Sequence, residues 1–286
     1  MKILLAKDAG YCFGVRDAVD LAYETAEKYG DVYMLGHIVH NENVVHALDE
    51  AGAKVVDNLD EVPDDKPILF RAHGTSVDTW VDAKAKDMNI VDATCPLVWE
   101  IHEEVKKLES EGRKIIIVGD HGHDEVVGIA SQVKDPIIVG TPKEAQALRK
   151  TKRAGVVSQS TQTIENVQEI INIIMTKVFD LRFVNTICFP TKRNQIQIKE
   201  LAKQCDVMIV IGSFTSANSK RLTALAKARN KNSYQVTCAD EIQTDWLAGA
   251  EVVGLSAGAS TPDNIIDEVL TKIKEIGNVP EEMVYG

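Results

Sequence analysis

Residues 95–125 read CPLVWEIHEEVKKLESEGRKIIIVGDHGHDE, and this stretch shows the pattern on which the whole chain is built. A cysteine comes first, and the proline after it is typical of the first turn of a helix. Apolar residues then recur at helical spacing, and a run of isoleucine and valine ends at Gly119. A short apolar run of this kind is typical of a buried parallel strand. The stretch therefore predicts a helix and then a strand, with polar side chains after the strand.

The same order of features occurs three times along the chain. Cys12, Cys95 and Cys188 are 83 and 93 residues apart, and 24 residues after each cysteine a glycine ends an apolar run. Polar residues follow at matching positions, namely His40, His123 and Ser216 at 28 residues from the cysteines and Glu42, Glu125 and Asn218 at 30 residues. A period this long is outside the range of solenoid repeats. We therefore expect an α/β fold of three small domains in a pseudo-threefold array.

A second apolar segment in each copy also ends in small polar residues, near His73, Ser160 and Ser260. In parallel α/β sheets, ligands bind beyond the carboxyl ends of the strands. The polar residues of the three copies are therefore expected to converge on one site with the cysteine sulfurs at its base. The domains are expected to span residues 14–94, 95–187 and 188–286, and residues 1–13, with a strand at residues 2–7, are expected to join the third.

Composition excludes several classes of protein. The chain has 286 residues, of which 44% are hydrophobic and 26% charged, as is ordinary for a soluble globular protein of two or three domains. Its formal net charge of −11 argues against non-specific nucleic-acid binding, which requires a basic face. No stretch approaches the ~18 apolar residues of a membrane span. We expect a cytoplasmic monomer with no nucleic-acid or membrane partner.

The cysteines predict a metal site. An odd number of cysteines in a long chain without a signal peptide favours a reducing compartment and metal or catalytic use over disulfides. Cys205 and Cys238 have no counterparts in the repeat and are expected to be ordinary core or boundary residues. The helix start after Cys95 would stabilise a thiolate. The three repeated cysteines can bind one metal, or three irons of a [4Fe–4S] cluster whose fourth iron stays open to a substrate oxygen.

Residues 119–128 are the part of the chain richest in groups that carry protons. Burial beside a metal would raise the pKa of Glu125, which could then donate a proton near neutral pH. His121 and His123 lack the partner spacing of a zinc site. His102, on the preceding helix, is expected to lie at the surface.

Short hydroxyl and amide side chains occupy residues 212–219 and 257–263. The first segment precedes a helix expected to start at Lys220, and such side chains add donors to the free N–H groups of a helix start. Because the histidines of the other copies lie in the same register, an anionic group such as phosphate is the expected ligand. Composition and spacing alone indicate an iron–sulfur enzyme that acts on a small phosphorylated, oxygenated substrate.

Seven motifs carry a resemblance to a known family. They are residues 11–15 (YCFGV), 38–41 (IVHN), 72–74 (AHG), 92–96 (DATCP), 122–126 (GHDEV), 185–188 (NTIC) and 257–263 (AGASTPD). In these motifs the chain closely resembles the 4-hydroxy-3-methylbut-2-enyl diphosphate reductase family. The resemblance implies a three-domain trefoil around a [4Fe–4S] cluster. It also implies an external electron donor such as ferredoxin or flavodoxin, and the last step of the methylerythritol phosphate route, which removes an allylic hydroxyl to give isopentenyl and dimethylallyl diphosphates.

The resemblance also implies roles for individual residues. Cys12, Cys95 and Cys188 would ligate the cluster, Glu125 would donate protons, and the diphosphate would be held by His40, His73, His123, Ser216, Asn218 and Ser260. The family's relay threonine falls on Ser160, which keeps the hydroxyl. Two further departures affect substrate affinity and choice: Phe214-Thr215 replaces Lys-Asn, and Asn194-Gln195 replaces Arg-Gln, with Arg193 displaced by one.

Other functions are compatible with the same cysteines, and they differ in whether they need an electron donor. A hydro-lyase of the aconitase kind also uses three cysteines and an open iron but needs no electron donor. A related reductase could act on a different small anionic alcohol. A non-catalytic iron–sulfur sensor or carrier would need neither an acid nor an anion site beside the metal.

Overall fold

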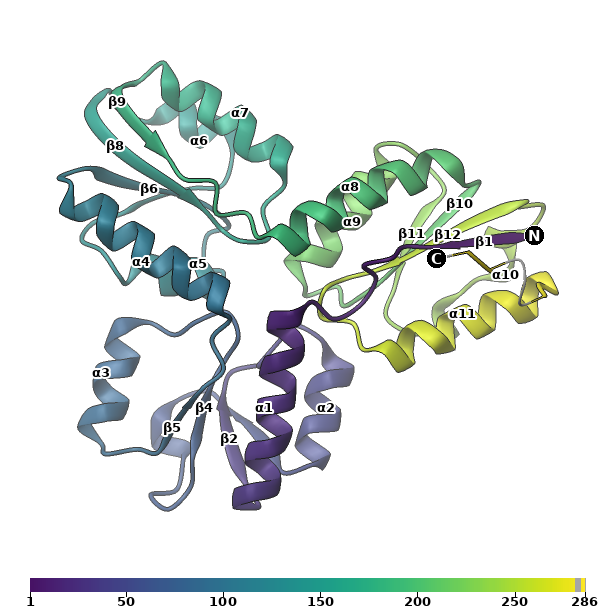
Figure 1. Cartoon of the computed structure of the whole chain (residues 1–286), viewed down its shortest axis with the longest axis horizontal. Coiled ribbons are helices and arrows are strands. Elements are labelled where there is room, and N and C mark those ends of the chain that lie inside the picture. The colour runs from purple at the N-terminus through teal and green to yellow at the C-terminus, as the bar shows by residue number, and fades with distance from the viewer. Residues whose placement is uncertain (281–283, 286) are drawn as a thin grey trace. The chain divides into compact units, whose positions relative to one another are not determined.

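The structure, a computed structural model, describes residues 1–280 and 284–285. Its strands form three separate sheets in which every pairing is parallel, and helices flank each sheet (Figure 1). The predicted α/β class is confirmed. No helix in the described residues combines the length and apolar content that crossing a membrane would need.

The first sheet has the strand order β3-β2-β4-β5. Its strands are β2 (Val32–Leu35), β3 (Ala53–Val56), β4 (Ile68–Phe70) and β5 (Ile90–Asp92). The helical segments of this part of the chain are α1 (Phe13–Tyr29), α2 (Glu42–Glu50), the 3-10 helix η1 (Leu59–Glu61) and α3 (Val77–Ala85).

The second sheet has the order β7-β6-β8-β9. Its strands are β6 (Lys114–Val118), β7 (Ile137–Val139), β8 (Thr151–Ser158) and β9 (Val178–Phe183). Its helices are α4 (Pro96–Ser110), α5 (Asp124–Ala130), α6 (Pro142–Ala147) and α7 (Ile164–Met175).

The third sheet has the order β11-β10-β12-β1-β13. Its strands are β1 (Lys2–Leu5), β10 (Val207–Ile211), β11 (Ser233–Val236), β12 (Val252–Ala257) and β13 (Val284–Tyr285). The helical segments are α8 (Phe189–Gln204), α9 (Ala217–Lys227), η2 (Ala239–Glu241), α10 (Thr244–Leu247) and α11 (Asp263–Gly277).

The three sheets repeat one topology. Four strands follow the same order in each, and the fourth is β5, β9 or β1. A cysteine follows this fourth strand in every case. The glycine after the central strand donates its N–H to the same neighbouring strand in all three sheets, through the pairs Gly36 to Val56, Gly119 to Val139 and Gly212 to Val236. The repeat in the sequence is therefore a repeat in the backbone.

The apolar run at residues 115–118 is explained by burial on both faces of β6. Ile116 and Val118 pack with residues of α6 and α7, whereas Ile115 and Ile117 pack with residues of α4 and α5. Figure 1 shows these helix pairs on opposite sides of the sheet. A strand covered on both faces has no polar side to expose. Full burial of each isoleucine contributes roughly 1.5–3 kcal/mol.

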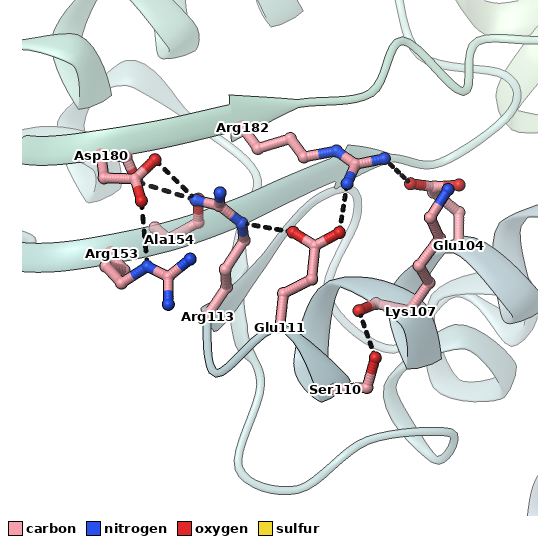
Figure 2. Close-up of polar contacts among 9 residues, drawn as sticks. All are labelled: Glu104, Lys107, Ser110, Glu111, Arg113, Arg153, Ala154, Asp180 and Arg182. Carbon is pink, nitrogen blue, oxygen red and sulfur yellow. Dashed lines mark hydrogen bonds and ion pairs between the residues drawn. The ribbon is translucent and has the colours of Figure 1, made fainter.

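An ion-pair network holds β9, the edge strand that leads toward Cys188. Asp180 of β9 accepts hydrogen bonds from Arg113 Nη1 at 3.0 Å and Arg153 Nε at 2.9 Å. These two arginines hold the pKa of the Asp180 carboxyl below its usual value. Figure 2 shows the rest of the network, in which Arg182 of β9 binds Glu104 and Glu111. Ion pairs as well as backbone hydrogen bonds therefore hold β9 to the neighbouring segments.

Two predicted boundaries were wrong by a few residues. The N-terminal strand ends at Leu5 and not at Lys7. The helix expected from Lys220 begins at Ala217, because the Ser216 side chain caps it by accepting a hydrogen bond from Ser219 N at 3.3 Å. An N-cap hydroxyl was thus read as part of the preceding loop.

The chain divides into two compact units. Unit 1 comprises Met1–Val15, His40–Val44 and Phe189–Gly286, and unit 2 comprises Arg16–Val39 and Val45–Cys188. The third sheet lies in unit 1, and the first two sheets lie in unit 2. The finer division into domains at residues 94 and 187 stays a prediction.

Candidate active site

The three repeated cysteines occupy one equivalent backbone position. In unit 2, Cys95 N donates to Ala72 O at 3.0 Å and Cys188 N donates to Ser160 O at 3.0 Å. In unit 1, Cys12 N donates to Ala259 O at 3.2 Å. Each acceptor lies two residues beyond the strand next to the sheet's fourth strand, so each cysteine is tied to the carboxyl end of its own sheet.

A helix begins directly after each of these cysteines, at Phe13, Pro96 and Phe189. Free N–H groups and the helix dipole at such a position stabilise a thiolate, which is the form that binds metal. All three thiols are half-buried, and none of the chain's five cysteines forms a disulfide. The chemistry of these three residues fits ligands of an iron–sulfur cluster.

The other two cysteines lack this setting. Cys205 is 9% exposed and packs against Met208 in an apolar cluster. Burial raises the pKa of the Cys205 thiol, because apolar surroundings disfavour a thiolate. Cys238 caps the 3-10 helix η2 without a side-chain hydrogen bond. These positions match the core and boundary roles predicted for them.

In unit 2, a buried carboxyl and a hydroxyl form a closed pair. Glu125 is 1% exposed in the first turn of α5. Ser160 donates to it twice, from its backbone N–H to Oε1 at 2.6 Å and from Oγ to Oε2 at 2.8 Å. The Ser160 carbonyl is also the acceptor for Cys188 N–H. The acid, the hydroxyl and one cysteine are therefore linked by consecutive hydrogen bonds.

Two histidines lie beside this pair. His123 is the N-cap of α5, and its Nδ1 accepts a hydrogen bond from Glu125 N at 3.2 Å. The rings of His73 and His123 are 5.7 Å apart and nearly perpendicular. Both are half-buried. Unit 2 thus gathers His73, His123, Glu125, Ser160, Cys95 and Cys188 at the carboxyl ends of its strands.

Arg71 forms an ion pair between the segments that follow the two sheets of unit 2. Its Nη1 lies 2.7 Å from Asp124 Oδ2, in the first turn of α5. A Cβ on Gly36 would lie 2.7 Å from the same nitrogen, and Gly36 has a φ of +71°. A side chain at Gly36 would therefore both strain the backbone and displace the arginine. Sequence reasoning missed Arg71, although it directly precedes the Ala72-His73-Gly74 motif.

Unit 1 brings together several of the polar residues predicted to hold an anion. Ser216 caps α9, and the buried Asn218 lies in the first turn of that helix. The Asn218 Nδ2 has no hydrogen-bond partner, so a buried donor points to a missing acceptor. Ser260 Oγ donates to His40 O at 3.3 Å, which brings the His40 segment to the carboxyl end of β12. Unit 1 thus gathers Cys12, His40, Ser216, Asn218 and Ser260.

Glu42 organises the loop before Ser216. Its Oε1 accepts hydrogen bonds from Ser213 Oγ at 2.8 Å and Thr215 Oγ1 at 3.1 Å. Ser213 Oγ also accepts from Thr215 N at 2.9 Å. The Thr215 departure noted in the sequence therefore has a partner, and Phe214 between the two hydroxyls is 53% exposed.

A cavity of about 330 Å³ lies beside Cys12 in unit 1. Asn194 lines it, and its buried Oδ1 has no hydrogen-bond partner. The rings of Phe13 and Phe189 stack beside the cavity with centroids 5.6 Å apart. The departure at Asn194 is therefore next to a proposed cluster ligand.

His102 corrects a further expectation. It is 1% exposed, not at the surface, because it lies on the face of α4 that also carries Ile101 and Val105. Neither ring nitrogen has a hydrogen-bond partner. Its spacing from these apolar residues was the available signal for burial.

Known proteins match the chain over nearly its whole length. Residues 3–274 match the family described as LytB protein. A curated protein from Geobacter metallireducens, named 4-hydroxy-3-methylbut-2-enyl diphosphate reductase, is 42% identical over 277 residues, which cover 96% of this chain and 98% of that one. A protein of the same name from Geobacter sulfurreducens is 41% identical over 279 residues, with 97% and 99% covered.

Two solved structures are also similar. One, described as (E)-4-hydroxy-3-methyl-but-2-enyl diphosphate reductase, the terminal enzyme of the non-mevalonate pathway, is 37% identical, with a TM-score of 0.72 and coverage of 96% of this chain and 100% of that one. The other, E-1-hydroxy-2-methyl-but-2-enyl-4-diphosphate reductase from Plasmodium falciparum, is 27% identical, with a TM-score of 0.92 and coverage of 100% and 91%. This chain belongs to the LytB protein family.

Proposed function

We propose that this chain reduces 4-hydroxy-3-methylbut-2-enyl diphosphate to isopentenyl and dimethylallyl diphosphates. The observation that carries the proposal is identity of 42% and 41% to two reductases of that name across 96% or more of the chain. In the reaction the allylic C–O bond breaks and two electrons enter. One proton joins the departing hydroxyl to form water, and a second forms a C–H bond.

Membership of the LytB family implies an iron–sulfur enzyme. We assign a [4Fe–4S] cluster to Cys12, Cys95 and Cys188, supported by their equivalent positions before three helix starts. When bound, such a cluster supplies electrons and a Lewis-acidic iron with an open position. Cys205 is unsuited to ligation because burial raises its thiol pKa.

We assign the diphosphate to the donors at the strand ends. In unit 1 the Asn218 amide and the N-terminus of α9 supply N–H groups, and Ser216 and Ser260 supply hydroxyls. His40, His73 and His123 add imidazole donors. Buried donors hold an anion more strongly than exposed ones, because water does not compete for them.

We assign proton delivery to Glu125 and Ser160. The carboxyl is enclosed, and its Oε2 lies 2.8 Å from Ser160 Oγ. A hydroxyl can accept a proton from the acid while it donates its own proton onward to the substrate hydroxyl. Loss of the threonine methyl at this position leaves that relay chemically intact.

Electrons would come from an external carrier, and we propose a ferredoxin or flavodoxin. We also propose that the protein acts as a monomer in the cytoplasm, where a reducing compartment keeps the three ligand thiols from forming disulfides.

An anaerobic assay of the reconstituted protein tests the proposal. With the allylic diphosphate and reduced viologen, the protein should form both isoprenoid diphosphates, and without a reductant it should form neither. Cys95→Ser should abolish turnover, whereas Cys238→Ser serves as the matched control and should keep it. Turnover without reductant would instead indicate a hydro-lyase, and no turnover at all would count against the enzyme assignment.

A further inference from the structure

A buried histidine outside the assigned machinery lies between segments of the site. His102 is 1% exposed, and neither of its ring nitrogens has a hydrogen-bond partner. Burial lowers its pKa to about 4, so the ring is neutral at physiological pH. A buried polar group without a partner destabilises the folded state. Such a group calls for an explanation in terms of what it contacts.

The imidazole edge lies against two glycine backbones of unit 2. A Cβ on Gly74 would be 3.1 Å from His102 Cε1 and 3.3 Å from Nε2. A Cβ on Gly128 would be 3.5 Å from the same Nε2 and 3.6 Å from the carbonyl carbon of Gly74. On another side the ring meets Trp99 edge to face at 5.4 Å. The ring therefore lies beside the place where the two glycines approach each other.

Both glycines belong to segments that carry proposed site residues. Gly74 directly follows His73, and its φ of +84° makes the tight turn there. Gly128 lies one helical turn after Glu125 in α5. His102 itself lies two turns along α4 from Cys95, at the helix start. A ligand cysteine, a substrate histidine and the acid are thus carried by three segments that meet at one ring.

We propose that His102 is a positioning residue that sets the spacing between the His73 turn and α5, and so the alignment of the acid with the bound substrate. The proposal rests on the function proposed above. A flat ring is suited to this place because a Cβ on either glycine would lie within 3.5 Å of it, so a side chain at Gly74 would have to displace the ring. A smaller side chain would leave a cavity beside both glycines into which the turn and the helix could shift, and a bulkier aliphatic branch would push them apart.

The test compares two buried residues on the same face of α4. His102→Ala removes the spacer. Leu108→Ala is the matched control, because Leu108 is also fully buried but contacts Gly155 of β8, away from the His73 turn. His102→Asn is a milder variant that keeps a flat polar group. Steady-state kinetics with reduced viologen and amide hydrogen exchange are measured on the reconstituted holoenzymes.

In His102→Ala, we expect kcat to fall about 10-fold and KM to rise, with faster exchange at residues 73–75 and 124–128. His102→Asn should recover part of both. Leu108→Ala should lower thermal stability but leave KM and the exchange of those two segments near wild-type values.

Unchanged kinetics and exchange in His102→Ala would overturn the proposal, as would equal losses in Leu108→Ala. If His102→Ala does not fold, the same comparison with His102→Asn decides the question. Exchange is read without turnover, so an inactive wild-type protein would refute the proposed function while the spacing could still be tested.

Discussion

Acidification from pH 7 to pH 5 should lower the free energy of unfolding by about 2 kcal/mol through His102 alone. Its pKa is 6.5 in the unfolded chain and about 4 in the folded one, because burial disfavours the charged ring. Above pH 6.5 the ring is neutral in both states. Between pH 6.5 and pH 4 the unfolded chain binds a proton that the folded chain does not, so falling pH favours unfolding.

The assay is urea denaturation of wild type and His102→Asn at several pH values, followed by tryptophan fluorescence. Trp80 and Trp99 lie in unit 2, so a Trp246→Phe background makes the signal report that unit. The asparagine variant cannot titrate, so it should lose about 2 kcal/mol less than wild type over this interval. Carboxylates with lowered pKa, such as Asp180, act at lower pH and equally in both proteins. Equal losses in the two proteins would refute the buried, neutral assignment of this ring.

Four further outcomes are expected. Glu125→Gln should lower the rate by ~10²-fold or more while iron content stays unchanged, because the amide keeps the shape of the carboxyl but cannot release a proton. Near-normal turnover of this variant would show that Glu125 is not the acid. The variants Cys12→Ser, Cys95→Ser and Cys188→Ser should each lose the iron and sulfide found by chemical analysis, and Cys205→Ser should keep both. Asn218→Ala should weaken inorganic diphosphate binding by roughly 1–3 kcal/mol in calorimetry, whereas Asn232→Ala, at an exposed position directly before β11, should not. Arg113→Ala should lower the Tm more than Lys106→Ala, because it removes one ion pair each from Asp180 and Glu111; equal Tm values would show that the bonds of Arg113 in Figure 2 add nothing to stability.

The repeat made much of the fold predictable. Three cysteines and three glycines at constant spacing led to the central strands and the strand ends, and the backbone hydrogen bonds of Gly36, Gly119 and Gly212 are equivalent in the structure. Such features depend on local patterns of apolar residues and turns, which any single copy of the repeat contains. Comparison of the three copies then shows which residues recur in all of them and which match a pattern only by chance.

Side-chain partners across long distances in sequence were not predictable in the same way. The repeat aligned Glu42 with Glu125, yet Glu42 binds hydroxyls at Ser213 and Thr215, more than 170 residues away. Such a contact depends on the packing of one sheet edge and on the rotamers of short side chains. The error at His102 was of another kind, since its place on the apolar face of α4 could have been read from its spacing.

The first strand of the chain completes a sheet whose other strands lie near the C-terminus. β1 pairs with β12 in the third sheet, and its residues meet partners about 250 positions later. During synthesis at ~5–20 residues per second, β1 waits roughly 12–50 s for that partner. Until then Cys12 has no Ala259 carbonyl to hold it, whereas the sheets that hold Cys95 and Cys188 can already form. Two of the three cysteines can therefore reach their final backbone positions early, and Cys12 reaches its position last. The complete set of proposed ligands exists only once the polypeptide is nearly finished.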